Sequence, residues 1–465
     1  MSVGAFALIV AQLGWRAGTP VPIADGTPEF VDLYWKAWEN YHAQVLTVPS
    51  HPGLPARVLA PGGELRFDDA WVSALYAKWA IAATPAIDSV VAASLFVEES
   101  GLAPERVSLD DLSVAGEATG FPIYALAASD LYGATASREK LSPLLSQVAR
   151  RSAWLRGRCA ATPGVLTVPA RYSMLPAQQT ATGLSETAEA AAVLLYDSAS
   201  LRELAGRLGL SNALAAYRQI YDEDRRRLMD LWRKDAKFFF AIDSADAQAE
   251  PLSLLPIWAS SLSDLDASKT DALAAALNDR ARFARPMLWP IVPPTAPGYD
   301  GTRGVKPLFQ YLTLRALRDF GSEARAESSA TEILRNLLRS GGEKHDLYEE
   351  YGAETRRPAE GAAANTPVAG LIPIAGFLEF VLGFEMDAEH DTLVWRIRRL
   401  DRHGIQNLRF GDNHLSVIAE PRAATSDPIR IEVTTENAVV LEVRSHGHKK
   451  ALRCKPGTNK FTVAP

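Results

Sequence analysis

The chain has 465 residues, and its 49 Lys and Arg against 55 Asp and Glu give a formal net charge of −6. With 47% apolar and 22% charged residues it has a globular composition, which excludes a disordered chain. The acidic balance argues against a nucleic-acid binder, and the two cysteines, Cys159 and Cys454, exclude a disulfide scaffold and any zinc site with three or four thiolates.

Residues 1–27 form an N-terminal segment with an apolar run from Ala5 to Trp15. This run is too short to span a bilayer, which takes about 20 residues. It has the length of the apolar part of a secretory signal, but no positive charge precedes it. The alternative is a short helix or strand packed on the body, so the sequence leaves extracytoplasmic and cytoplasmic localisation equally open. No later segment is apolar enough to cross a membrane.

Residues 28–388 show a helical pattern. In the stretch Glu29–Gln44 one face is apolar and the opposite face carries charged side chains, as an amphipathic helix requires. The apolar positions are Phe30, Leu33, Tyr34, Ala37, Trp38 and Tyr41. Further helices are predicted to begin at Ser268 and Ser322, because serine is a favoured N-cap residue.

About a dozen such helices follow one another along these residues. They lack the interleaved strands of a Rossmann or TIM-barrel chain, and they carry no short repeat with a consensus, which argues against a solenoid. We therefore predict a mainly α fold, in which residues 28–388 form an (α/α)6 toroid of helical hairpins.

Residues 389–465 change to a period of two. Apolar and polar side chains alternate along 393–397, 429–433 and 439–443, and turn-forming residues separate these runs. This pattern predicts a small C-terminal antiparallel β-module packed on the helical body.

Several common catalytic and cofactor motifs are absent. The chain has no Walker A loop, no dinucleotide fingerprint, no HExxH and no GxSxG segment. His446, His448 and Cys454 are residue types that bind metals, but a polar turn between edge strands is the simpler interpretation of this segment. We therefore predict neither a metal nor a cofactor.

Acidic residues on aromatic and glycine-rich stretches between helices point to carbohydrate chemistry. Glycoside hydrolysis needs one carboxylic acid to protonate the leaving oxygen and one carboxylate to activate water or to attack. Three stretches offer such acids: Phe67–Trp71, Gly298–Gly301 and Leu347–Gly352.

On these three stretches the chain resembles the trehalase-like and mannosylglycerate hydrolase-like (α/α) toroid glycosidases. The resemblance extends from about residue 28 to residue 420. Phe67–Trp71 resembles the W-D-T-x-F segment of the family, which implies that Asp68 binds the sugar. Tyr348–Tyr351 resembles W-E-N-Y, which implies that Glu349 is the catalytic base. Arg303-Gly304 resembles the start of the R-G-x-x-W-P loop, and Leu255–Trp258 resembles a substrate-facing segment.

The general acid of the family is the departure from this resemblance. It is an Asp in a G-M-D-N-[ST]-P segment, and the corresponding stretch here is Tyr172–Pro176, with Leu175 at the position of the acid. Loss of a positioned general acid typically costs about 10²–10⁴-fold in rate. Asp300, Glu99 and Glu186 are more distant acids that are alternatives for the role.

Each of these residues also has a purely structural interpretation. Asp68 or Asp69 is a candidate N-cap of the following helix, and Glu349 a candidate solvated loop acid. Arg303 is a candidate partner of a helix C-terminus. Tryptophan buries a large apolar area in a core as well as under a sugar, and this applies to Trp71, Trp258 and Trp289.

The sequence therefore predicts a glycoside hydrolase-like protein that acts by inverting hydrolysis on a small α-linked sugar or glycosyl-glycerate. Glu349 is the predicted base, and Asp68, Trp71, Trp258 and Arg303 are the predicted substrate-binding residues. The alternative is a catalytically inactive carbohydrate-binding or scaffold protein that kept the toroid. The predicted partner is a carbohydrate ligand, with no nucleic acid and no membrane span.

Overall fold

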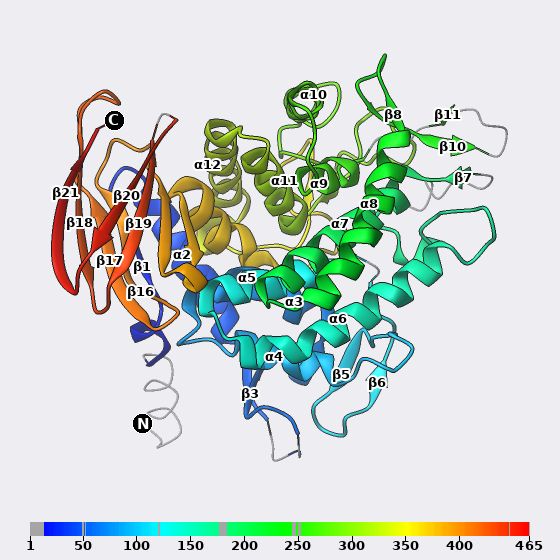
Figure 1. Ribbon diagram of the computed structural model, residues 1–465, viewed down its shortest axis with the longest axis horizontal. Coiled ribbons are helices and arrows are strands. Elements are labelled where there is room, and N and C mark those ends of the chain that lie inside the picture. Colours follow the sequence, from blue (N-terminus) through cyan, green and yellow to red (C-terminus); the bar gives the residue numbers. More distant parts are fainter. Residues whose placement is uncertain are drawn as a thin grey trace.

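The computed structural model describes residues 14–48, 51, 53–119, 121–175, 184–243, 248–249, 253–445 and 447–464. A helical body occupies one side of the molecule, and two β-sheets lie against it (Figure 1). Most of the apolar run that starts at Ala5 lies outside the described residues. Within the described part of the chain, no helix combines the length and the apolarity that crossing a bilayer requires.

Eleven α-helices of the described residues, followed by a π-helical segment, build the body. Their bounds are α2 (Pro28–His42), α3 (Phe67–Ala77), α4 (Ala86–Ser94), α5 (Tyr124–Thr135), α6 (Arg138–Cys159), α7 (Ala188–Arg207), α8 (Ser211–Asp230), α9 (Leu255–Ser261), α10 (Ala267–Asn278), α11 (Pro307–Asp319), α12 (Glu323–Ser340) and η7 (Ile372–Val381).

The helix patterns of the sequence agree with these elements. In α2 the buried residues are the six that the pattern predicts, and Pro28 begins the helix where a missing N–H costs nothing. Ser322 is the N-cap position of α12, as predicted. For α10 the prediction is wrong, because the Asp266 side chain, not Ser268, accepts the capping hydrogen bond from Lys269.

The helices alternate between inner and outer positions. Helices α3, α5, α7, α9 and α11 contact one another in that order, and η7 contacts both α11 and α3. The other helices pack outside them, and α7 and α8 show the contrast: 16 of the 20 residues of α7 are buried, but only three of the 20 in α8. The apolar core therefore lies between the inner helices.

Within the loops of the helical body, short β-strands pair with one another. The sequence pattern predicts only helices and loops there. They form the pairs β2 (Val45–Thr47) with β3 (Arg57–Leu59), β8 (Trp232–Arg233) with β9 (Phe238–Phe239) and β12 (Gly304–Val305) with β13 (Tyr351–Gly352), and the three-stranded sheets of β4 (Glu64–Arg66), β5 (Arg106–Ser108) and β6 (Val114–Ala115) and of β7 (Leu184–Glu186), β10 (Ala241–Asp243) and β11 (Gln248–Ala249).

The C-terminal part forms two sheets. One has the order β1-β16-β17-β18-β21, and the other the order β14-β15-β19-β20. Their bounds are β1 (Val21–Ala24), β14 (Phe384–Asp387), β15 (Thr392–Arg396), β16 (His403–Phe410), β17 (Asn413–Ala419), β18 (Ile429–Thr435), β19 (Val439–Ser445), β20 (His448–Cys454) and β21 (Gly457–Val463). Pairing is antiparallel, as predicted, except that β15 and β19 run parallel.

One feature of these sheets differs from the sequence expectation. The strand β1, which precedes the helical body, pairs with β16 as an edge strand (Figure 1). The residues considered for a metal do not converge: His448 and Cys454 stand at opposite ends of β20, about 20 Å apart at the rise of a strand. His446 lies outside the described residues.

Candidate active site

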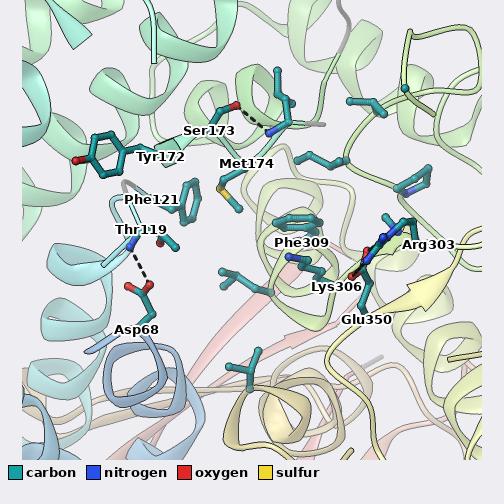
Figure 2. Close-up of a pocket in the computed structure, with 18 of the residues that line it drawn as sticks. Asp68, Thr119, Phe121, Tyr172, Ser173, Met174, Arg303, Lys306, Phe309 and Glu350 are labelled. Carbon is teal, nitrogen blue, oxygen red and sulfur yellow. Dashed lines mark hydrogen bonds and ion pairs between the residues drawn. The ribbon is translucent and has the colours of Figure 1, made fainter. Parts of the chain in front are cut away.

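A cavity of about 670 Å³ lies where loops lead into the inner helices (Figure 2). Its wall includes residues from the start of α3, from 119–123 before α5, from 171–175, from 290–309 around the start of α11, and Glu350 and Val368. These segments are far apart in sequence, and the packing of the inner helices brings them together.

Asp68 lines this cavity from the first turn of α3. It caps nothing there: its Oδ2 accepts a hydrogen bond from the Thr119 N–H at 3.1 Å, and its Oδ1 accepts one from the Tyr124 hydroxyl at 3.0 Å. Burial raises the pKa of Asp68, against the opposing effects of these hydrogen bonds and of the Arg151 charge. Asp68 is thus a fixed carboxyl group on the cavity wall.

Arg303 and Glu350 lie together on another part of the wall (Figure 2). The Arg303 guanidinium binds both carboxylate oxygens of Glu350 at 3.3–3.4 Å, and the Gly304 N–H donates to Glu350 at 2.9 Å. Gly304 has a φ of +93°, which favours glycine at this point. Burial raises the pKa of Glu350, but Arg303, Gly304 and Lys306 together hold it below its usual value, so Glu350 is ionised at neutral pH.

Glu349, the predicted base, is half-buried and is not among the residues that line the cavity. Its Oε1 accepts from the Ala363 N–H at 3.4 Å. Its charge also acts on Asp69 at the start of α3: burial first, then the charges of Asp68 and Glu349, raise the pKa of Asp69 to about 7 against the effect of Arg66. Glu349 therefore lies within electrostatic range of the start of α3, from which Asp68 lines the cavity.

The aromatic wall of the cavity is made of Phe121, Tyr172, Tyr299 and Phe309. The predicted sugar platform Trp258 is only 1% exposed and lies behind this wall, packed on Phe121 and Phe309 at ring distances of 5.8 and 5.6 Å. Its Nε1 donates to the Thr313 hydroxyl at 2.8 Å.

Trp71, the other predicted sugar platform, is likewise buried behind residues that line the cavity. It is 1% exposed and packs against Tyr124, whose hydroxyl binds Asp68. Trp289 is fully buried, and its Nε1 donates to the Leu277 carbonyl oxygen. The tryptophans thus support the residues that face the cavity and do not line it themselves.

Leu175 lines the cavity at the position that corresponds to the missing acid; Pro176 lies outside the described residues. Asp300 also lines the cavity, but the Thr302 hydroxyl and N–H both bind its Oδ1 and lower its pKa, so it is ionised. Glu99 and Glu186 are not lining residues.

Sequence reasoning missed three polar contributors. Arg171 and Lys306 line the cavity, and Lys306 forms no ion pair with any described residue. Ser173 lines it as well, and its hydroxyl binds the buried carboxyl of Glu189. In a loop that is shorter than the R-G-x-x-W-P loop of the family, Lys306-Pro307 stands where Trp-Pro is expected, and this departure was a signal for Lys306. The contact of Ser173 with Glu189 depends on the tertiary fold.

Comparison with known proteins agrees with the family resemblance that the sequence motifs indicate. Residues 115–367, more than half of the chain, match the model of the family described as "Mannosylglycerate hydrolase MGH1-like glycoside hydrolase domain". A search of curated proteins gives no match.

Solved structures share the fold. The GH63 mannosylglycerate hydrolase from Thermus thermophilus, in complex with glucose, is 17% identical, with a TM-score of 0.53 over 74% of this chain and 99% of that chain. The same enzyme with Tris and D-glycerate gives a TM-score of 0.55 at 16% identity, over 74% and 99%. A Streptomyces avermitilis α-L-rhamnosidase complexed with L-rhamnose has a TM-score of 0.61 at 15% identity, over 96% of this chain and 42% of that chain.

Proposed function

Because the chain belongs to the family of mannosylglycerate hydrolase MGH1-like glycoside hydrolases, we propose that it hydrolyses a small α-linked sugar or a glycosyl-glycerate with inversion at the anomeric carbon. The observation that carries the proposal is the convergence of Asp68 with the Arg303–Glu350 pair on one cavity. Its volume of about 670 Å³ is in the range of small-ligand sites.

The residues divide into binding and chemical roles. Asp68 and Arg303 hold sugar hydroxyls through charge-assisted hydrogen bonds. Phe121 and Phe309 offer ring faces to the sugar, while Trp71 and Trp258 contribute by supporting residues of this wall. Glu349 takes a proton from the attacking water, as the motif implies, and Glu350 holds Arg303 in place.

The charges of the wall support an acidic leaving group. Lys306 has no carboxylate partner among the described residues, and it stands at the N-cap position of α11. Helix N-termini carry partial positive charge, so Lys306 and the start of α11 together favour an anion such as the carboxylate of glycerate. The start of α3 also lies at the cavity, but the carboxyl groups of Asp68 and Asp69 already stand in its first turn.

We further propose that the inner helices α3, α5, α7, α9, α11 and η7 and their outer partners form a six-hairpin (α/α)6 toroid at residues 28–388, followed by the β-module at 389–465. The order of contacts between the inner helices supports this closure. In such a toroid the loops at one end of the inner helices form the site, which agrees with the composition of the cavity wall.

The second candidate is a protein that binds carbohydrate without hydrolysing it. Leu175 favours this function, since it places an aliphatic side chain on the wall where a proton donor belongs. Arg303, Asp68 and the aromatic wall would bind a sugar in either case.

The two functions are separated by incubation with α-linked disaccharides and glycosyl-glycerates, for wild type, Glu349→Gln and Glu350→Gln. We expect turnover that is lost in Glu349→Gln, and a raised KM with much of kcat retained in Glu350→Gln. Proton NMR of the first product reports its anomeric configuration, and a retained α configuration would contradict inversion. Binding without turnover in the wild type would leave the second candidate, and loss of kcat in Glu350→Gln alone would move the base to Glu350.

A further inference from the structure

Ser173 connects the cavity to a buried carboxyl group. It lies on the wall two residues before Leu175 (Figure 2). Its Oγ donates to Oε1 of Glu189 at 2.7 Å and accepts a hydrogen bond from the Leu175 N–H at 3.0 Å. The Met174 N–H also donates to the same Glu189 oxygen, at 3.2 Å.

Glu189 is only 7% exposed, in the first turn of the inner helix α7. It forms no ion pair with any described residue, and its hydrogen-bond partners are the neutral donors of Ser173 and Met174. Burial raises its pKa to about 7, against the smaller effect of these two bonds. Glu189 is thus a carboxyl group that holds a proton near neutral pH, unlike the ionised Glu350 and Asp300.

We propose that Glu189 and Ser173 form a proton relay that replaces the general acid lost at Leu175, with Ser173 in contact with the leaving oxygen and Glu189 behind it. The proposal rests on the proposed hydrolase function. In this arrangement Ser173 is the catalytic residue, and Glu189 is a positioning residue that also resupplies the proton.

The hydrogen-bonding capacity of the serine hydroxyl permits this relay. A hydroxyl has one donor and two acceptor positions. When Glu189 is protonated, the Ser173 oxygen accepts from Glu189 and from the Leu175 N–H, and its own O–H is free to donate into the cavity.

Protons and bonds balance in this step. As the bond from the anomeric carbon to the leaving oxygen breaks, the Ser173 proton moves to that oxygen and the Glu189 proton moves to Ser173. Water attacks the anomeric carbon and gives its proton to Glu349, so the sum is the addition of one water across the glycosidic bond. Glu189 ends as a carboxylate and Glu349 as an acid, and exchange with solvent restores both.

The test compares two leaving groups in Glu189→Gln, Ser173→Ala and the control Glu139→Gln. Glu139 is an exposed glutamate in the first turn of α6. The amide oxygen that Glu189→Gln introduces can accept the same hydrogen bonds, but the amide supplies no proton. The substrates are the best glycoside of the wild type and the fluoride of the same sugar, whose leaving group needs little protonation.

We expect kcat on the glycoside to fall about 100-fold or more in both variants, and kcat on the fluoride to stay within about threefold. The wild-type kcat should fall above about pH 7, and this alkaline limb should vanish in Glu189→Gln. Glu139→Gln should resemble the wild type on both substrates.

Equal losses on glycoside and fluoride, or no loss on either, would overturn the relay. Thermal unfolding shows whether each variant is folded, and if Glu189→Gln is not, Ser173→Ala decides alone. A wild type that turns over neither substrate overturns the proposed hydrolase and the relay with it. A wild type that is active while both variants are unaffected overturns the relay only.

Discussion

The Arg303 guanidinium lies 3.3 Å from the Glu350 carboxylate, although 47 residues separate them in the chain. The side chain of Arg303 is 56% exposed and that of Glu350 only 15%. The pairing of β12 with β13 brings the two residues together and fixes one part of the cavity wall. The arginine is therefore held in a defined position and still faces the cavity.

The Arg303–Glu350 pair makes part of the folding stability depend on pH. Since the pKa of Glu350 is lowered in the folded protein, its contribution is complete above the unfolded value of about 4.5 and is lost as the pH falls through the folded value. We expect the wild type to lose more thermal stability than Glu350→Gln between pH 6 and pH 3. Melting curves across this range measure the difference. The exposed Glu343→Gln is the control, and parallel pH curves for wild type and Glu350→Gln would contradict the prediction.

Tyr124→Phe tests how Asp68 is held. The change removes the donor to Oδ1, so that Asp68 keeps only its hydrogen bonds with Thr119, and it also removes the contact of the hydroxyl with the Thr119 carbonyl oxygen at 3.1 Å. We expect a loss of about 1–3 kcal/mol in the free energy of unfolding, measured by urea denaturation. Tyr221→Phe is a matched control, since Tyr221 is equally buried but its hydroxyl has no partner among the described residues. A loss of the same size in both variants would show that the Asp68 contact contributes nothing.

Lys78 lies in a buried ion-pair network between the inner helices α5, α11 and η7. Its Nζ is 2.7 Å from Asp130 and 2.9 Å from Glu379, and all three side chains are at most 12% exposed. Lys78→Met removes the nearest cation from Glu379, whose next one is Arg318 at 3.9 Å, while Arg315 stays 2.7 Å from Asp130. Because one buried carboxylate loses its close partner, we expect a cost of about 3–5 kcal/mol in the free energy of unfolding. Arg227→Ala breaks an exposed i,i+4 pair with Glu223 and should cost less than about 1 kcal/mol. Equal costs in denaturant titrations would refute this.

Phe309→Leu and Trp258→Phe distinguish the role of a residue that lines the cavity from that of a residue packed behind it. Phe309 lines the cavity but is only 3% exposed. Phe309→Leu should therefore weaken sugar binding by roughly threefold to tenfold and also lower the free energy of unfolding by about 1–2 kcal/mol. Trp258→Phe removes the hydrogen bond to Thr313 inside the core, so it should lower the free energy of unfolding by about 1–3 kcal/mol. Calorimetric titration with the sugar and melting curves measure both effects. Stronger loss of binding in Trp258→Phe than in Phe309→Leu would reverse the assignment.

Sequence patterning predicts this fold where one face of an element is buried. The period of 3.6 in 29–44 and the period of two in 429–433 and 439–443 correspond to α2, β18 and β19, because burial of one face imposes the spacing. The family assignment from the motifs is also confirmed. The strand β1 is not predictable in this way, since its four residues are too few to show a period and its partner is distant.

The site is less accessible to sequence reasoning. The motifs single out Asp68 and Arg303, and both line the cavity. They also single out Glu349, but its neighbour Glu350 is the one that lines the cavity, because adjacent residues of a loop point in different directions according to its backbone. The motifs do not distinguish a tryptophan on the wall from one behind it, since both positions are apolar. Glu189 reaches Ser173 only through the packing of α7.

The position of β1 has a consequence for synthesis of the chain. Val21 pairs with Gln406 and Ala24 with His403. At about 5–20 residues per second, the ribosome reaches β16 roughly 20–80 s after it has made β1. The first strand of the described residues is therefore made before the entire helical body, and its hydrogen-bonding partner is made only after that body. Pairing of β1 with β16 thus belongs to the last events of folding.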